Sequence, residues 1–113
     1  MKYIALIYSA QGSEASYEGD MIADYGAFNQ EAIAAGVFIA GDALMPVSSA
    51  STVQMRGGKA AITDGPFAET KEALGGYYLL DCSDLDEALK WAAKIPTSQV
   101  GTIEVRPIMV FDQ

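Results

Sequence analysis

Hydrophobic and polar residues follow two different periods along the chain, and the changes of period predict the secondary structure. The apolar run Tyr3–Tyr8 has no polar face, which is typical of a central strand covered on both sides. A helix is predicted next, because apolar residues recur at intervals of four, four, three, four and three, at Tyr17, Met21, Tyr25, Phe28, Ala32 and Ala35. Ser16 is the predicted N-cap, and Gly36 stands where a left-handed residue ends a helix. Val37–Asp42 follows directly as a second strand.

The middle of the chain predicts a β-hairpin followed by a polar loop. Thr52–Arg56 alternates polar and apolar residues, Gly57-Gly58 is a turn dipeptide, and Lys59–Thr63 returns. One face of this hairpin is therefore expected to be solvated. From Asp64 to Gly76, turn formers and alternating charges occur together without hydrophobic periodicity. A polar loop between two strands is a common position for functional groups.

The last third of the chain predicts a strand, a helix and a final strand. Tyr77–Cys82 is apolar, and a helix opens at Ser83 with acids in its first turn and lysines toward its end, as the helix dipole favours. The predicted buried face of this helix consists of Leu85, Ala88, Leu89 and Ala92, and Pro96 follows its end. Gly101–Met109 is the predicted last strand.

Without the hairpin, this order is β-α-β-β-α-β, an α+β fold of the ferredoxin-like type into which the hairpin is inserted. Residues 1–113 are predicted to form a single domain, large enough to bury roughly two thirds of its unfolded surface. Both helices should cover one face of an antiparallel sheet and leave the other face bare. A bare face with this much apolar content predicts a partner.

Composition narrows the classes of partner. Half of the residues are hydrophobic, so the chain is globular, and 15 acids against 7 bases give a net charge of −8. The bases are spread along the chain, so we expect no nucleic-acid partner. No segment approaches the roughly 20 apolar residues that span a bilayer. The N-terminal apolar run lacks the cleavage pattern of a signal peptide. We therefore expect a cytoplasmic protein that does not enter membranes.

Missing residue types limit the chemistry. The chain has no histidine and one cysteine, Cys82. This composition removes the usual general base near neutral pH, every Ser-His or Cys-His pair, and any site built on several cysteines. Cys82 is interpreted as a small apolar residue at a strand end rather than a nucleophile. No metal or cofactor is predicted, and chemistry would depend on carboxylates, lysine, arginine or tyrosine.

The loop after the hairpin supplies most of the candidate site residues. Asp64 is the candidate general base if it is buried beside other acids, and the alternative is an Asx-turn to nearby backbone N–H groups. Phe67 would either cap an apolar pocket or fill the core. Lys71, which lies between Glu69 and Glu72, would either contact a substrate or balance charge.

The last strand supplies the remaining candidates. Ile103 and Val105 should face the helices, so Glu104 and Arg106 should point to the bare face. The Arg106 guanidinium has the planar geometry that holds a substrate carboxylate. The alternative is a structural ion pair, either between these two residues or between subunits.

The sequence also resembles a known family. Asp64-Gly65-Pro66-Phe67 followed by Ala68-Glu69-Thr70-Lys71-Glu72 is similar to the signature of DGPF proteins, a branch of the YCII-related (YciI-like) family. The resemblance extends over nearly the whole chain. It includes the segments 1–8, 40–44, 75–78, 85–92 and 103–109.

This resemblance implies a dimeric α/β barrel, in which the bare sheet faces of two subunits pack together as a homodimer. Some YCII-like proteins resemble muconolactone-isomerase-type enzymes and use a His–Asp pair on small aromatic or lactone substrates. This chain has no histidine, so only an aspartate could correspond, either Asp42 or Asp64. The genes of DGPF proteins also resemble accessory genes that neighbour those of extracytoplasmic-function sigma factors. This resemblance implies a link to transcriptional regulation.

Two functions are predicted as alternatives. The first is a small-molecule-binding or lyase/isomerase-like protein for an acidic, phenolic or lactone ligand. Its cleft at the dimer barrel would be lined by Asp64, Phe67, Glu69, Lys71, Glu72, Glu104 and Arg106. The second is a non-catalytic regulatory or interaction module, whose acidity would suit a basic protein partner.

Overall fold

The computed structural model describes residues 1–111, which form six strands, two α-helices and three short 3-10 helices. The strands are β1 (Lys2–Ser9), β2 (Phe38–Ala43), β3 (Ser51–Arg56), β4 (Lys59–Asp64), β5 (Ala73–Asp81) and β6 (Thr102–Pro107). The helices are α1 (Met21–Ala34) and α2 (Leu85–Ala93), and the 3-10 helices are η1 (Ser13–Ser16), η2 (Val47–Ser49) and η3 (Pro96–Gln99).

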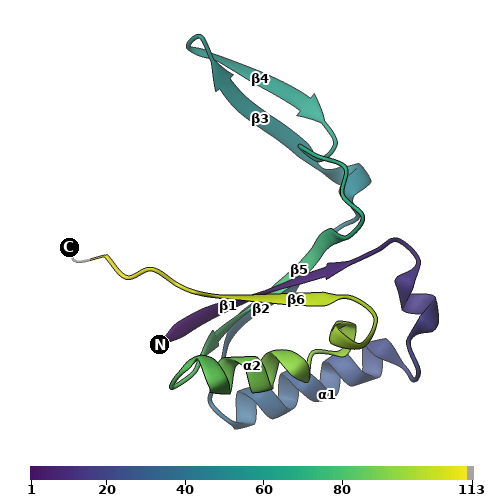
Figure 1. Cartoon of the computed structure of the whole chain (residues 1–113), viewed down its shortest axis with the longest axis vertical. Helices are drawn as coiled ribbons and strands as arrows, with labels where there is room; N and C mark the ends of the chain where they lie inside the picture. The colour runs from purple at the N-terminus through teal and green to yellow at the C-terminus, as the bar shows by residue number, and fades with distance from the viewer. Residues whose placement is uncertain (112–113) are drawn as a thin grey trace.

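Four strands form one antiparallel sheet in the order β2-β5-β1-β6. Each helix connects two strands that are parallel to each other, with an antiparallel strand between them. Both helices lie on the same side of this sheet (Figure 1). This is the ferredoxin-like α+β plan, as the sequence predicted.

The hydrophobic core lies between the helices and one face of the sheet. Tyr3, Ala5 and Ile7 of β1 and Leu80 of β5 are buried there, because alternate side chains of a strand point to one face. Ile95, which follows α2, is also fully buried. Ile103 and Val105 of β6 pack against the same cluster, which confirms their predicted orientation toward the helices.

The other face of the sheet, here called the open face, has an apolar centre. Ile4 lies between Leu79 and Arg106 in neighbouring strands, and Leu6 lies between Tyr77 and Glu104. The apolar residues at these positions are only half-buried. No element of the described chain covers this face, so the prediction of a bare sheet face is confirmed (Figure 1).

Helix α1 begins later than the hydrophobic spacing predicts. It starts at Met21, and its N-cap is Asp20, whose carboxylate accepts a hydrogen bond from the Ala23 backbone N–H at 3.2 Å. The prediction of Ser16 as the N-cap was wrong, because Gly19 adopts a φ of 117° and interrupts a continuous helix. Gly36, which was predicted to end the helix, does have left-handed geometry, with a φ of 75°.

Helix α2 is capped by Asp84, which accepts a hydrogen bond from the Glu87 backbone N–H at 2.9 Å. Only part of its predicted apolar face is buried. Ala88 and Ala92 are buried, whereas Leu85 and Leu89 are about half exposed. The small alanine side chains let this helix approach the sheet closely, and the two leucines then fall at the edge of the contact.

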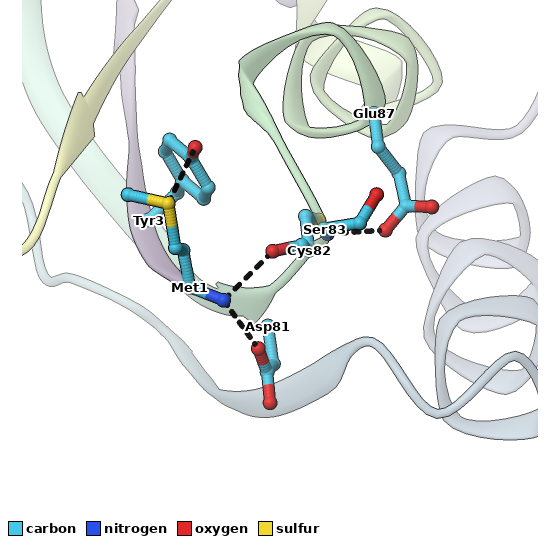
Figure 2. Close-up of polar contacts among 6 residues, drawn as sticks. All are labelled: Met1, Tyr3, Asp81, Cys82, Ser83 and Glu87. Atoms are coloured by element: carbon cyan, nitrogen blue, oxygen red, sulfur yellow. Dashed lines mark hydrogen bonds and ion pairs between the residues drawn. The ribbon is translucent and has the colours of Figure 1, made fainter.

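Backbone and side-chain hydrogen bonds fix the junction between β1, β5 and α2 (Figure 2). The Met1 amino group donates to Asp81 Oδ1 at 3.2 Å and to the Cys82 carbonyl at 2.9 Å. The Ser83 backbone N–H donates to Glu87 Oε1 at 3.0 Å and satisfies a donor just before the helix. Cys82 itself is buried, and this burial is the main cause that raises its pKa to about 11, so it is a poor nucleophile.

Strands β3 and β4 pair only with each other and form a hairpin that projects away from the sheet, on the side opposite to both helices (Figure 1). Gly57 and Gly58 at its tip have φ values of 58° and 77°, the left-handed pair that a tight two-residue turn requires. Val53 and Ile62 are 64% and 73% exposed, so the hairpin is solvated on both faces rather than on one. The reason is that no helix or strand of the described chain lies against it.

No helix within residues 1–111 combines the length and the apolar character that crossing a bilayer requires.

Candidate functional site

The larger cavity described in the structure has a volume of about 370 Å³ and lies on the helical side of the sheet. Helix α1 and η3 form one wall, and the adjoining ends of β1, β2 and β5 form the other. The lining residues with polar groups are Ser9, Tyr25, Asn29, Asp42, Tyr77, Tyr78 and Thr97, and Ile7 and Phe38 supply apolar surface. This volume is within the range of pockets that bind small ligands.

Tyr78 is the central side chain of this cavity. It is 6% exposed, and its hydroxyl donates to Asn29 Oδ1 at 2.5 Å. Its ring is stacked with Tyr25, with a centroid distance of 6.5 Å, and tilted against Phe28 at 4.9 Å. Burial is the main cause that raises the pKa of Tyr78 to about 12, and neighbouring Tyr25 adds to it. At neutral pH the hydroxyl is therefore a neutral hydrogen-bond donor in an apolar pocket.

A second hydrogen bond joins the two elements of the helical wall. The Tyr25 hydroxyl on α1 and Thr97 Oγ1 on η3 are 2.5 Å apart. Thr97 is only 7% exposed, so its hydroxyl lies inside the protein. Buried hydroxyl groups need such partners, so this pair fixes the position of η3 relative to α1.

The carboxylate of this region belongs to Asp42 at the edge of the sheet. The Tyr77 hydroxyl donates a hydrogen bond to Asp42 Oδ2 at 2.8 Å. Asp42 on β2 and Tyr77 on β5 lie opposite each other in the sheet. This hydrogen bond is the main cause that raises the pKa of Tyr77. Because side chains alternate along a strand, this pair extends to the open face while Tyr78 extends into the cavity. Asp42 therefore borders both the cavity and the open face.

Gly41 makes room for the central tyrosine. It lies opposite Tyr78 in the adjacent strand, and a Cβ atom built on Gly41 would be 2.5 Å from Cδ1 of the Tyr78 ring. We predict that Gly41→Ala destabilises the protein by about 2 kcal/mol, because the packed ring must move. Urea denaturation would measure this loss. Gly75→Ala is the matched control, since its Cβ would meet nothing closer than 3.9 Å, and equal losses for both variants would contradict the prediction.

Comparison with known proteins places the chain in a family. The model of the YCII-related domain matches residues 1–112. The chain belongs to the YCII-related family. An uncharacterised protein of Rhizobium meliloti (strain 1021) is 33% identical to it over 117 residues, which cover 98% of this chain and 94% of that protein.

One solved structure resembles this YCII-related protein in fold. It is 5-chloro-2-hydroxyhydroquinone dehydrochlorinase from Burkholderia phenoliruptrix AC1100, in complex with 2,5-dihydroxybenzoquinone. The TM-score is 0.57, and the match covers 96% of this chain and 94% of the dehydrochlorinase. The sequence identity is 14%, so the likeness concerns the fold alone.

The loop residues that the sequence indicated for the site of this YCII-related protein lie outside this cavity. Asp64 ends β4, and its side chain makes no hydrogen bond within the described chain, so the predicted Asx-turn is absent there. Phe67 is 86% exposed, Glu69 and Lys71 are also exposed, and Glu72 is half-buried. None of these loop residues lines either cavity that the structure describes.

Glu104 and Arg106 lie on the open face, as predicted, and both are exposed. They form no ion pair with each other within residues 1–111; the two ion pairs found there are Met1–Asp81 and Lys94–Glu31. A single subunit therefore does not bring Arg106 and the loop residues into one cavity. Their role in a ligand site stays a prediction that depends on a second subunit.

Sequence reasoning missed Asn29, Tyr78 and Thr97, and it considered Tyr25 only as one of the apolar residues of the predicted helix. A usable signal exists for one of them. Asn29 directly follows Phe28 on the buried face of a predicted helix, where an amide needs a partner. The hydroxyl of Tyr78, which contacts Asn29 from 49 residues away, carries no comparable local signal.

Proposed function

We propose that this YCII-related protein binds a small, uncharged, hydroxylated aromatic molecule in the cavity between α1, η3 and the sheet. The observation that carries the proposal is the pairing of hydroxyl and amide groups inside an aromatic cavity. Tyr78 with Asn29, and Tyr25 with Thr97, offer hydrogen-bonding groups beside stacked rings. A phenol presents both a flat apolar ring and a hydroxyl, which suits such walls.

The charge of the cavity supports a choice among the ligand classes that the sequence left open. Among the described residues, no lysine or arginine lines the cavity, and Asp42 contributes a carboxylate at its edge. An acidic ligand would lose its hydration without gaining a cation, so phenolic or lactone ligands are favoured over acidic ones. The likeness in fold to a dehydrochlorinase solved with a dihydroxybenzoquinone supports a hydroxylated six-membered ring as the ligand and has no bearing on the charge of that ligand.

The position of Asp42 also bears on the aspartate of related enzymes. Asp42 borders the cavity, whereas Asp64 lies on the exposed hairpin. We therefore assign Asp42, with its partner Tyr77, as the group that would exchange a proton with a bound phenol. Asp64 keeps its proposed role as a general base only in the second candidate site described below.

The test is a thermal-shift screen of the whole chain with simple dihydroxybenzenes, lactones and benzoate. A dihydroxybenzene at a hundredfold excess over its Kd should stabilise the protein by about 2.7 kcal/mol, and benzoate should not. In the Tyr78→Phe variant the same ligand should bind about tenfold more weakly, because one hydrogen-bonding group is lost. Ligand binding that is unchanged in Tyr78→Phe and Thr97→Val would contradict the assignment of the cavity.

A second candidate site keeps the residues that the sequence indicated. In a homodimer with its open faces packed together, the loop 64–72 of one subunit and Glu104 and Arg106 of the other could form one cleft. The half-buried apolar centre of the open face favours such a dimer. Asp64→Asn and Arg106→Ala are the discriminating variants. They should not affect a ligand of the helical-side cavity, and they should weaken a ligand of the dimer cleft.

The regulatory alternative makes an opposite prediction for the same screen. A non-catalytic module that binds a basic protein, such as a component of a sigma-factor system, would show no ligand-induced shift of its melting temperature. It would instead retain a protein partner on affinity purification from the cell.

A further inference from the structure

The β3–β4 hairpin is amphipathic, although no part of the described chain covers it. Its register places Val53 opposite Ile62 and Met55 opposite Ala60, so these apolar residues share one face. Thr52, Gln54 and Arg56 point to the opposite face. Val53, Met55 and Ile62 are 64%, 61% and 73% exposed. An isolated two-stranded hairpin is marginally stable in water, so this one needs a surface to lie on.

The whole chain exposes more surface than a monomeric protein of its size. A monomer of 12.0 kDa exposes about 6,000 Å², whereas this chain exposes 7973 Å². Its radius of gyration is 16.1 Å, against about 13 Å for a compact domain of this length. The excess of about 2,000 Å² is comparable to the area that one subunit buries in an obligate homodimer, about 1,000–2,500 Å².

The distribution of charge indicates that the surface on which the hairpin lies belongs to a second copy of the same chain. The hairpin tip carries Arg56 and Lys59, while the rest of the chain has 15 acids and five bases and thus a net charge of −10. The basic tip of one copy is therefore complementary to the acidic body of another. The hairpin also projects on the same side as the open face (Figure 1). A second copy that covers the open face would stand within reach of the hairpin.

We propose that the β3–β4 hairpin is an arm that lies against a second copy of this chain, with Val53, Met55 and Ile62 packed inward. In a two-fold symmetric pair each subunit provides one arm and receives the other. This inference extends the homodimer proposed above, which requires only that the two sheets face each other. It gives the exposed hairpin a function as an association element.

The test compares neighbouring positions on opposite faces of β4 by sedimentation velocity over a range of concentrations. Ile62→Asp should raise the dimer dissociation constant at least about tenfold, because it places a charge in the apolar contact. Ala61→Asp carries the same charge on the polar face, and its constant should stay within about twofold of the unmodified protein. Circular dichroism should show both variants folded, because Ile62 is 73% exposed in the single chain.

A photo-crosslinking residue at position 55 or 54 gives a second measurement that does not depend on weakening the dimer. Position 55 should produce covalent dimers and position 54 should not, because their side chains point to opposite faces of the arm. A dimer that is unaffected by Ile62→Asp and crosslinks equally from both positions would overturn the arm and leave the face-to-face dimer intact. A chain that stays monomeric at all concentrations would overturn both.

Discussion

Gly101→Ala is expected to destabilise the protein by about 3 kcal/mol or more, as overpacking against backbone does. Gly101 lies between η3 and β6, where the chain passes close to the end of β1. A Cβ atom at this position would be 2.2 Å from the Tyr8 carbonyl oxygen and 3.1 Å from Thr97 Cγ2. The nearest atom belongs to the backbone of a central strand, so a small side-chain movement cannot relieve the clash. Urea denaturation followed by circular dichroism would measure the loss.

Gly26→Ala is the matched control for this prediction. Gly26 lies inside α1, and a Cβ atom there would meet nothing within 4 Å. Alanine in a helix interior is favoured over glycine, so this variant should gain about 0.5–1 kcal/mol. If Gly101→Ala were as stable as the unmodified protein, the close approach between β6 and Tyr8 would be wrong.

The Gly101→Ala variant should also affect the proposed ligand site. The Gly101 backbone N–H donates to the Thr97 carbonyl at 2.7 Å, and Thr97 holds Tyr25 through its hydroxyl. Movement of residue 101 would therefore shift one wall of the cavity. A Gly101→Ala protein that still folds should bind a dihydroxybenzene more weakly than the Gly26→Ala control.

Local sequence signals predicted the elements of this fold well where one interaction dominates. The Gly57-Gly58 dipeptide fixes the hairpin turn, because both residues must have positive φ values. The alternation of Ile103 and Val105 with polar residues predicted which face of β6 packs on the helices. The start of α1 was missed because the spacing from Tyr17 continues the helical period across Gly19, where the backbone departs from a helix.

The candidate site was harder to predict because it is made by long-range contacts between uncharged side chains. Tyr25 and Thr97 are 72 residues apart in sequence, and Asn29 and Tyr78 are 49 residues apart. Each of these residues is compatible with an ordinary core when it is considered alone. Charged residues of the loop 64–72 attracted attention instead, because the sequence offered no packing reason for them.

The cavity beside Tyr78 and the open face with the loop 64–72 differ in where their walls come from. This difference explains why only the first is a cavity in a single subunit. The cavity beside Tyr78 is formed within one chain, because its lining residues come from α1, η3 and the sheet. Arg106 points to the side of the sheet that the chain leaves uncovered, and the loop that joins β4 to β5 lies on the same side (Figure 1). Any site there must take its second wall from another molecule. Ligand binding by the cavity and by the open face can therefore be tested independently.

Leu80→Ala is the second change for which we expect a large effect, a loss of about 3 kcal/mol in the free energy of unfolding. Leu80 is fully buried in β5, and it lies opposite Tyr3 of β1 and Phe38 of β2. Truncation leaves a cavity between three strands and the helices, where the surrounding side chains cannot collapse completely. Thermal and urea denaturation would both report the loss.

Leu79→Ala gives the contrast that makes this result informative. Leu79 is the next residue along the strand, but it points to the open face and is only half-buried in one chain. Its truncation should cost about 1 kcal/mol at concentrations where the chain is monomeric, because little apolar area returns to water. At concentrations that favour the dimer the cost should rise, since the proposed homodimer buries the open face. A cost at position 79 that equals the cost at position 80 in the monomer would contradict the assignment of the two faces.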